Sequence, residues 1–225
     1  MTYSLVINEV GGEGYQDRTL KNVQSADLTI ALAINFNSGG EKLTMRLAGN
    51  KYLALPLFNS ERETAVKLFK RCRDDNVKSL NIAGNGLYTL KRGDGGWTQD
   101  KINQYVYDVI SLVHTHHKID FMVSGGQTGV DLAGAVAAKA LGIPFRLNMP
   151  EKLKHRNCDR FDVYNTKEQI LRQVDIGESK IVKNNLIENN KNEVNEVVKK
   201  RNKYKPWLKK PTNVGFFVTK LNITF

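Results

Sequence analysis

Residues 121–131 read FMVSGGQTGVD, and this stretch decides the fold. The apolar run FMVS leads into two glycines, and the small-residue segment LAGAVAAKALG follows at residues 132–142. This order predicts a buried strand, a glycine-rich loop and a helix that Gly142 closes. In such a loop backbone N–H groups can approach an anion, and the helix N-terminus adds about half a positive charge. We therefore expect the loop to bind a phosphate.

Strand and helix patterns alternate along most of the chain. Apolar, β-branched strand patterns occur at residues 26–34, 51–57, 77–84, 119–124 and 143–150. Between them lie helix patterns at residues 41–50, 60–76, 98–118 and 132–142. This alternation predicts an α/β fold, an open and mainly parallel Rossmann-like sheet with helices on both faces.

The helix predicted at residues 60–76 has a recognisable start. Ser60 is the expected N-cap, and Glu63 occupies the reciprocal position of a capping box. The positions that we expect on its buried stripe are Val66, Leu68, Phe69 and Cys72.

Three predicted strands run into loops that contain glycine. In open parallel sheets ligands bind outside the carboxyl ends of the strands, so these loops should form one composite pocket. The predicted ligand-binding residues are Arg18, Ser38, Gly39, Gly40, Glu41, Thr44, Gly84, Asn85, Ser124, Gly125, Gly126, Gln127, Thr128, Gly129 and Asp131.

The side chains of the GGQTG loop suggest how a ligand would be held. Ser124 and Thr128 can donate hydroxyl hydrogen bonds, and the Gln127 amide can reach a phosphate or a base. Asp131 either caps the helix or accepts hydrogen bonds from a ribose.

The other candidates each have a structural alternative. Glu41 is either a carboxylate beside a ribose or a first-turn residue that the helix dipole favours. Arg18 either clamps a phosphate with its planar guanidinium group or forms a salt bridge. Asn85 either contacts the ligand or tolerates an unusual turn conformation.

Several common nucleotide and metal motifs do not occur in the sequence. It contains neither GxxxxGK(S/T) nor GxGxxG, which disfavours a P-loop ATPase and an ordinary dehydrogenase. Cys72 and Cys158 lie far apart, and His114, His116 and His117 point in different directions on a helix. We therefore predict no metal site and no cofactor.

Residues 121–145, FMVSGGQTGVDLAGAVAAKALGIPF, resemble the opening of the molybdenum-carrier proteins, a branch of the SLOG/lysine-decarboxylase-like Rossmann superfamily. Residues 15–57 resemble a later segment of that family, in which an RT…NV…DxT pattern leads into a GGxxLT loop. The residues that carry this likeness are Arg18, Thr19, Asn22, Asp27, Thr29, Gly39, Gly40, Leu43 and Thr44. Here the later block precedes the GGQTG block, which implies a circularly permuted SLOG domain over about residues 14–150.

The resemblance implies a pocket for nucleotides or nucleotide-derived ligands, because related SLOG domains bind such molecules as sensors or cleave them as phosphoribohydrolases. The hydrolase branch shows PGGxGTxxE, whereas residues 38–44 here read SGGEKLT, with Glu41 shifted forward. The resemblance therefore does not imply that this chain is catalytic, and it does not imply that the chain binds molybdenum.

The composition is typical of a soluble globular protein, with 225 residues, 40% of them hydrophobic and 25% charged. No apolar run approaches the roughly 20 residues that cross a bilayer, and the first residues lack the features of a secretory signal. We therefore expect no membrane contact and a cytoplasmic location. The net charge of +11 is concentrated at residues 180–225, where eleven Lys or Arg face three Glu.

The resemblance implies a SLOG-like nucleotide-binding domain, which we expect at residues 1–175. The concentration of positive charge predicts a basic, helical C-terminal extension at residues 176–225. Within the extension, residues 199–210 interleave Tyr204 and Trp207 with basic residues, as single-stranded nucleic-acid binders do. A solvated basic tail, or a helix packed on a partner subunit, is the alternative.

Three functions stay open from the sequence. The first is binding of a nucleotide, cyclic nucleotide or ADP-ribose-like signal, as a phage-type sensor or sequestering protein. The second is a nucleotide N-glycosidase or phosphoribohydrolase, in which Glu41 or Asp131 stabilises an oxocarbenium-like ribose. The third is nucleic-acid binding through the basic tail. A homo-oligomer is expected, because related folds often dimerise.

Overall fold

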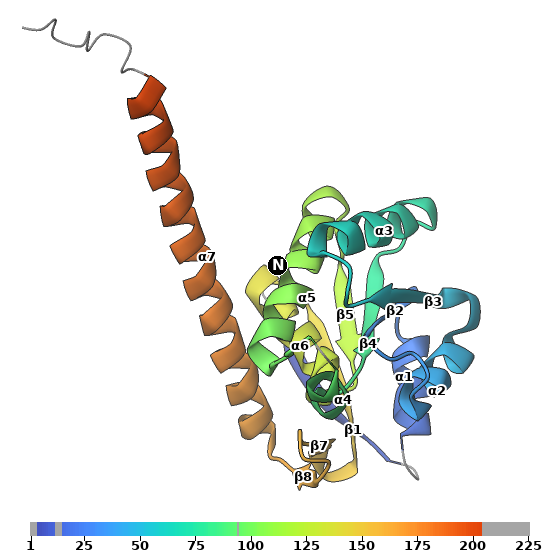
Figure 1. Ribbon diagram of the computed structural model, residues 1–225. Helices are drawn as coiled ribbons and strands as arrows, with labels where there is room; N and C mark the ends of the chain where they lie inside the picture. The colour runs from blue at the N-terminus through green and yellow to red at the C-terminus, as the bar shows by residue number, and fades with distance from the viewer. Residues whose placement is uncertain (1–3, 12–14, 94, 204–225) are drawn as a thin grey trace, which may run out of the picture. The chain divides into compact units, whose positions relative to one another are not determined.

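The predicted strands pair into one parallel sheet in the computed structural model, which describes residues 4–11, 15–93 and 95–203 (Figure 1). The strand order is β1-β6-β5-β4-β2-β3, and every neighbouring pair is parallel. The strands are β1 (Leu5–Val10), β2 (Leu28–Ala33), β3 (Tyr52–Pro56), β4 (Ser79–Gly84), β5 (Phe121–Ser124) and β6 (Phe145–Pro150). The predicted α/β fold with an open parallel sheet is confirmed.

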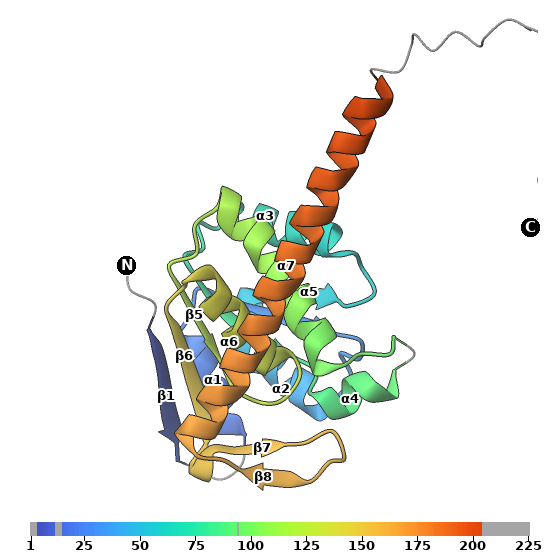
Figure 2. The same cartoon turned by 90° about the vertical axis from the view of Figure 1, so that its left-hand side faces the viewer.

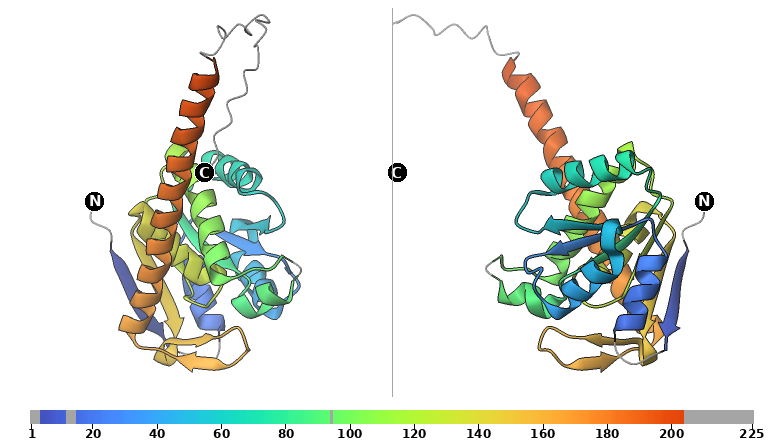
Figure 3. Two further views of the ribbon diagram at one scale, coloured as in Figure 1. Left: turned by 60° about the vertical axis from the view of Figure 1, so that its left-hand side comes forward. Right: turned by 90° about the vertical axis from the view of Figure 1, so that its right-hand side faces the viewer.

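Helices cover both faces of the sheet (Figures 1 and 3). One face carries α1 (Gln16–Gln24) and α2 (Gly39–Ala48). The other carries α3 (Glu61–Asp74), α5 (Gln99–His116) and α6 (Val130–Leu141), as right-handed crossovers require for this strand order. The shorter elements are the 3₁₀ turns η1 (Gly49–Lys51) and η2 (Glu151–Leu153) and the helix α4 (Leu87–Arg92).

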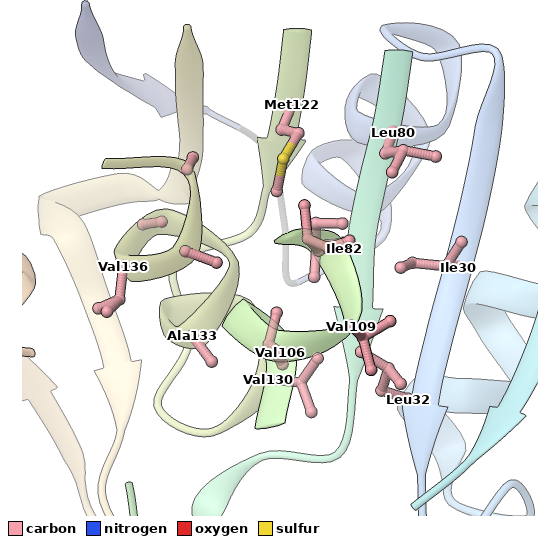
Figure 4. Packing of buried hydrophobic residues seen from close by; sticks show 14 of the residues in the cluster. Ile30, Leu32, Leu80, Ile82, Val106, Val109, Met122, Val130, Ala133 and Val136 are labelled. Carbon is pink, nitrogen blue, oxygen red and sulfur yellow. The ribbon is translucent and has the colours of Figure 1, made fainter. Parts of the chain in front are cut away.

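The centre of the core lies between the middle strands and the helices α5 and α6 (Figure 4). Every residue of β2 is buried, which explains why its sequence is an uninterrupted apolar run. α6 can approach β4 closely because Gly134 has no side chain, since a Cβ atom there would lie 2.9 Å from Ile82. The labelled core residues in Figure 4 are Ile30, Leu32, Leu80, Ile82, Val106, Val109, Met122, Val130, Ala133 and Val136.

Helix α3 begins as predicted but buries a slightly different face. Ser60 and Glu63 form the reciprocal hydrogen bonds of a capping box. Leu68 and Cys72, four residues apart, are fully buried, whereas Val66 is 62% exposed. The prediction for Val66 was wrong, because a residue two positions from Leu68 points to the opposite side of a helix.

After β6 the chain forms a small antiparallel hairpin, β7 (Lys154–Arg156) and β8 (Asp162–Tyr164), which runs toward α4 (Figure 2). Helix α7 (Lys167–Lys203) follows. Its first turns pack on the core through the buried Ile170 and Val174, and Gly177 lies against α6 and α5.

By its internal contacts the chain divides into two compact units, residues 1–184 and residues 185–225. The predicted boundary between residues 175 and 176 lies within the continuous helix α7, and the division into two functional domains stays a prediction. Residues 204–225, with Tyr204 and Trp207 of the predicted nucleic-acid segment, lie outside the described residues. In the described part of the chain, no helix combines the length and apolar character needed to cross a membrane.

Replacing Gly134 by Val should destabilise the protein by about 1–3 kcal/mol, because the added side chain collides with Ile82 across the α6–β4 contact. Urea denaturation measures the change. Ala140→Val, on the same helix but half-exposed, is the control and should cost only the few tenths of a kcal/mol of the lower helix propensity. Equal changes in the two variants would contradict the close packing of α6 on β4.

Candidate functional site

A cavity of about 610 Å³ opens at the carboxyl ends of β2 and β4. These neighbouring strands lead to helices on opposite faces, since α2 follows β2 and α5 follows β4. Such a topological switch point leaves a crevice between the two connections, where ligands of open α/β sheets bind. The cavity is lined by the start of α1, the loop before α2, the end of β4 with α4, part of the GGQTG loop and the β7–β8 hairpin.

The structure brings most of the predicted site residues to this cavity. Those that line it are Arg18, Ser38, Gly39, Gly40, Glu41, Thr44, Gly84, Asn85, Gly125, Gln127 and Asp131. The other four, Ser124, Gly126, Thr128 and Gly129, do not line it. Ser124 is the last residue of β5, and the other three belong to the GGQTG loop, so more than half of this loop lies away from the cavity.

The glycines of the GGQTG loop are needed for packing. Gly126 and Gly129 have φ angles of 71° and 93°, in the region that side-chain-bearing residues avoid. A Cβ atom at Gly129 would lie 2.5 Å from the carbonyl oxygen of Asn85, and one at Gly125 would lie 1.9 Å from Arg18 Nη1. The glycine pattern thus has a structural explanation that requires no phosphate.

The polar side chains of this loop also have partners within the protein. Thr128 Oγ1 donates to the carbonyl oxygen of Arg156 over 2.7 Å. The Gln127 amide donates to the carbonyl of Lys154 and accepts from the N–H of Arg156. Ser124 Oγ donates to the carbonyl oxygen of Asp131 over 2.9 Å. Through Gln127 and Thr128 the loop therefore holds the β7–β8 hairpin in place.

A buried ion pair occupies the place where the sequence suggests a phosphate. Arg18 Nη1 donates to the carbonyl oxygen of Gly125 over 2.7 Å and lies 3.4 Å from Asp131 Oδ2. Burial raises the pKa of Asp131, while Arg18 and the backbone N–H groups of Gln127 and Gly125 act in the opposite direction. The loop N–H groups thus bind a carboxylate of the protein itself.

The loop before α2 is open by comparison. Ser38 is the N-cap of α2, and its hydroxyl accepts a hydrogen bond from the N–H of Glu41. A Cβ atom at Gly39 or Gly40 would meet nothing within 4 Å, and their N–H groups have no acceptor among the described residues. Thr44, by contrast, donates its hydroxyl to the carbonyl of Gly40. The first two residues of this ten-residue helix are therefore exposed, line the cavity and have N–H groups with no acceptor among the described residues.

Glu41 is a buried acid next to these N–H groups. The residue is 4% exposed, and Asn85 Nδ2 donates a long hydrogen bond of 3.5 Å to its Oε1. Burial, and secondarily the charge of Asp131, raise the pKa of Glu41 to about 8. Glu41 thus carries a proton at neutral pH. Burial also raises the pKa of Asp131 above its ordinary value, and Arg18 and two N–H groups offset only part of that rise.

Several residues that line the cavity were not predicted as site residues, and four of them carry notable polar groups. Asn81 and Tyr15 each contribute a buried polar atom, and Arg156 and Arg160 extend from the β7–β8 hairpin. Only Asn81 had a usable signal, since it is a polar residue inside the apolar strand SLNIAG. Among the described residues no group of three or more His, Cys, Asp or Glu side chains could hold a metal ion.

Replacing Glu41 by Gln should weaken the dependence of stability on pH. The pKa of Glu41 is about 8 in the folded protein, against an ordinary value of 4.5, so between these values only the folded state keeps the proton. The free energy of unfolding of the wild type therefore falls as pH rises from about 5 to 8, by on the order of 3 kcal/mol from this group. Glu41→Gln removes that fall, which urea denaturation at several pH values would measure.

The matched control is Glu63→Gln. Glu63 lies at the surface, and hydrogen bonds from Ser60 lower its pKa. Removing its carboxylate should therefore leave unchanged the decrease in the free energy of unfolding above pH 5. An unchanged slope in Glu41→Gln would show that Glu41 is ionised in the folded protein.

The comparisons with known proteins agree with the permuted order of the sequence blocks. Residues 1–88 match the circularly permutated YpsA SLOG family. No curated protein and no solved structure matched the chain. The matched stretch contains α1, the open loop before α2 and all of β4, so it supplies one side of the cavity. Together with the six-stranded parallel sheet, the match identifies the fold as a circularly permuted SLOG domain, similar over residues 1–88 to the circularly permutated YpsA SLOG family.

Proposed function

We propose that the protein binds a nucleotide or a nucleotide-derived small molecule in the cavity at the carboxyl end of β4. The main support comes from buried polar atoms without partners. Five such side-chain atoms occur among the described residues, and four of them belong to residues that line this cavity. They are Tyr15 Oη, Arg18 Nε, Glu41 Oε2 and Asn81 Oδ1.

Unpaired buried polar groups are costly, about 1–3 kcal/mol each, and most native proteins avoid them. A cluster of donors and acceptors at one cavity is therefore best explained by a molecule that pairs with them. The mixture includes a cationic donor, a phenol, an amide oxygen and a carboxyl group, which matches the hydroxyl groups and ring nitrogens of a nucleoside.

The phosphate position that we favour is the N-terminus of α2 and not the GGQTG loop. The N–H groups of Gly39 and Gly40 are unpaired among the described residues and border open space. An anion there would gain these hydrogen bonds and the positive end of the helix dipole. The ribose would then lie near Glu41 and Asp131.

The wider predictions about biological role rest on this binding function. A sensor or sequestering role requires only that the nucleotide is captured, and it needs no catalytic group. The likeness to molybdenum-carrier proteins adds nothing to the proposal, since the described residues offer no metal cluster. Nucleic-acid binding through residues 199–210 and a homo-oligomer stay predictions.

The second candidate function is hydrolysis of an N-glycosidic bond, which the pairing of Glu41 with Asp131 favours. Burial keeps a proton on Glu41 at neutral pH, so it can protonate the leaving base nitrogen as the C–N bond breaks. Asp131 can stabilise the positive charge that develops on the ribose. Water then adds its hydroxyl to C1′ of the ribose and returns a proton to Glu41.

The binding proposal is tested by isothermal titration calorimetry against a panel of nucleoside monophosphates, diphosphates, cyclic nucleotides and ADP-ribose. Gly40→Val should lower the affinity for the best ligand about tenfold or more, because the new side chain fills the phosphate position. Its stability should stay close to that of the wild type, since the added atoms meet no protein atom. Gly11→Val, also at an open glycine but outside the cavity, should bind normally. The proposal fails if no member of the panel binds at millimolar concentration.

The hydrolytic candidate is tested by incubating the same nucleotides with the protein and separating free base by chromatography. Base release should fall by about 100-fold or more in Glu41→Gln, since a general acid typically contributes this much. Asp131→Asn should slow the reaction as well, and Glu63→Gln should not. Tight binding of a nucleotide without any release of base would exclude hydrolysis and leave binding as the function.

A further inference from the structure

The β7–β8 hairpin brings a group of cations to the cavity beside two tyrosine rings. The guanidinium carbon of Arg156 lies 6.0 Å from the centroid of the Tyr15 ring, and Lys154 Nζ lies 5.7 Å from it. At the hairpin turn, the guanidinium carbon of Arg160 lies 5.3 Å from the centroid of Tyr88. Tyr15, Tyr88, Arg156 and Arg160 all line the cavity.

The positive charge of this group exceeds the negative charge around it. Lys154 and Arg156 share one carboxylate, Asp162, at 3.4 Å and 2.9 Å. Arg160 makes no ion pair with any described residue, and neither does Arg92, which also lies over the Tyr88 ring. A cavity wall with unbalanced cations attracts an anion, and guanidinium groups bind phosphate in a bidentate manner.

The hairpin is held rigidly enough to present these cations before a ligand arrives. Gln127 and Thr128 fix both backbone groups of Arg156 and the carbonyl of Lys154. The turn is closed by a hydrogen bond from the N–H of Arg160 to the carbonyl of Asn157. Arg160 itself has a φ angle of 72°, a conformation that a side-chain-bearing residue adopts at some cost and that often marks functional loops.

These cations are separate from the phosphate position at α2. They come from the hairpin after β6, whereas Gly39 and Gly40 follow β2, on the other side of β4 and β5 in the sheet. We propose that Arg156 and Arg160 form a second phosphate subsite, so that the ligand is a nucleotide with a second phosphate group. This inference rests on the proposed binding function and names the class of nucleotide that the cavity takes.

The test measures the binding of AMP, ADP, adenosine 3′,5′-bisphosphate and ADP-ribose by isothermal titration calorimetry. At least one of the three ligands with two phosphates should bind the wild type about tenfold or more tightly than AMP. The three ligands differ in where the second phosphate lies. In ADP it is attached to the first phosphate, in adenosine 3′,5′-bisphosphate it is on the 3′ oxygen of the ribose, and in ADP-ribose it links the first phosphate to a second ribose. Arg160→Gln should remove most of this advantage and change the affinity for AMP less than about twofold.

Arg146→Gln is the matched control, because Arg146 lies 5.3 Å from the centroid of the Phe121 ring in the same type of contact but does not line the cavity. It should leave all affinities unchanged. If AMP binds as tightly as all three larger ligands, the second subsite is refuted while the binding function stands. An equal loss for AMP and for the best ligand in Arg160→Gln also refutes it, since Arg160 would then contact the first phosphate. If none of the four ligands binds but a nucleotide with a single phosphate from the wider panel does, the second subsite is refuted and the binding function stands. If no nucleotide of the whole panel binds, this inference falls together with the proposed function.

Discussion

The site depends on the hydrogen bonds of one buried amide, that of Asn85. Its Oδ1 accepts from the N–H groups of Ile34 and Asn35 at 3.0 Å and 2.9 Å, and its Nδ2 donates to the carbonyl of Asn35. Asn85 follows β4 and the other two residues follow β2, so these bonds tie together the two loops that leave the paired strand ends. Helix α2 starts shortly after Asn35, and its open N–H groups and Glu41 are positioned by the same contact. The amide is 2% exposed, and in such surroundings its hydrogen bonds are hard to replace by water.

The two glycine motifs of the chain have different physical roles. At Gly126 and Gly129, glycine allows positive φ angles and close contacts with neighbouring atoms. The polar groups of this loop are used within the protein, since Gln127 and Thr128 bind the hairpin and the N–H groups of Gly125 and Gln127 bind Asp131. At Gly39 and Gly40, glycine leaves the start of a helix uncovered. An anion site needs free N–H groups as well as room, and only the second motif has both. A glycine-rich turn between a strand and a helix therefore does not by itself indicate where a phosphate binds.

The sequence predicted the buried part of the fold well and the periphery poorly. Strands β2 to β6 are apolar runs because both faces of the sheet are covered. Helix α5 lies where the pattern predicts a helix, and it buries Ile102, Val106, Val109, Ile110 and Val113 at helical spacing. Strand β1 was missed, because it lies at the edge of the sheet and buries only Ile7 among polar neighbours such as Asn8 and Glu9. Helix α1 has no side-chain N-cap and only two aliphatic residues, Leu20 and Val23, so only the family resemblance drew attention to Arg18.

The candidate site was predictable where it follows from topology and unpredictable where it follows from side-chain contacts. Parallel strands share one carboxyl edge, which brings Glu41, Gly84 and Asp131 to one cavity whatever their order in the chain. No sequence pattern reveals that Arg156 reaches Tyr15, since that contact depends on hydrogen bonds from Gln127 to the hairpin. The shared carboxyl edge of the sheet also explains why the site can form although the two sequence blocks are in permuted order. Arg18 and Asp131, 113 positions apart, need only be delivered to that edge to form their ion pair, and a parallel sheet delivers them in either order of the two blocks.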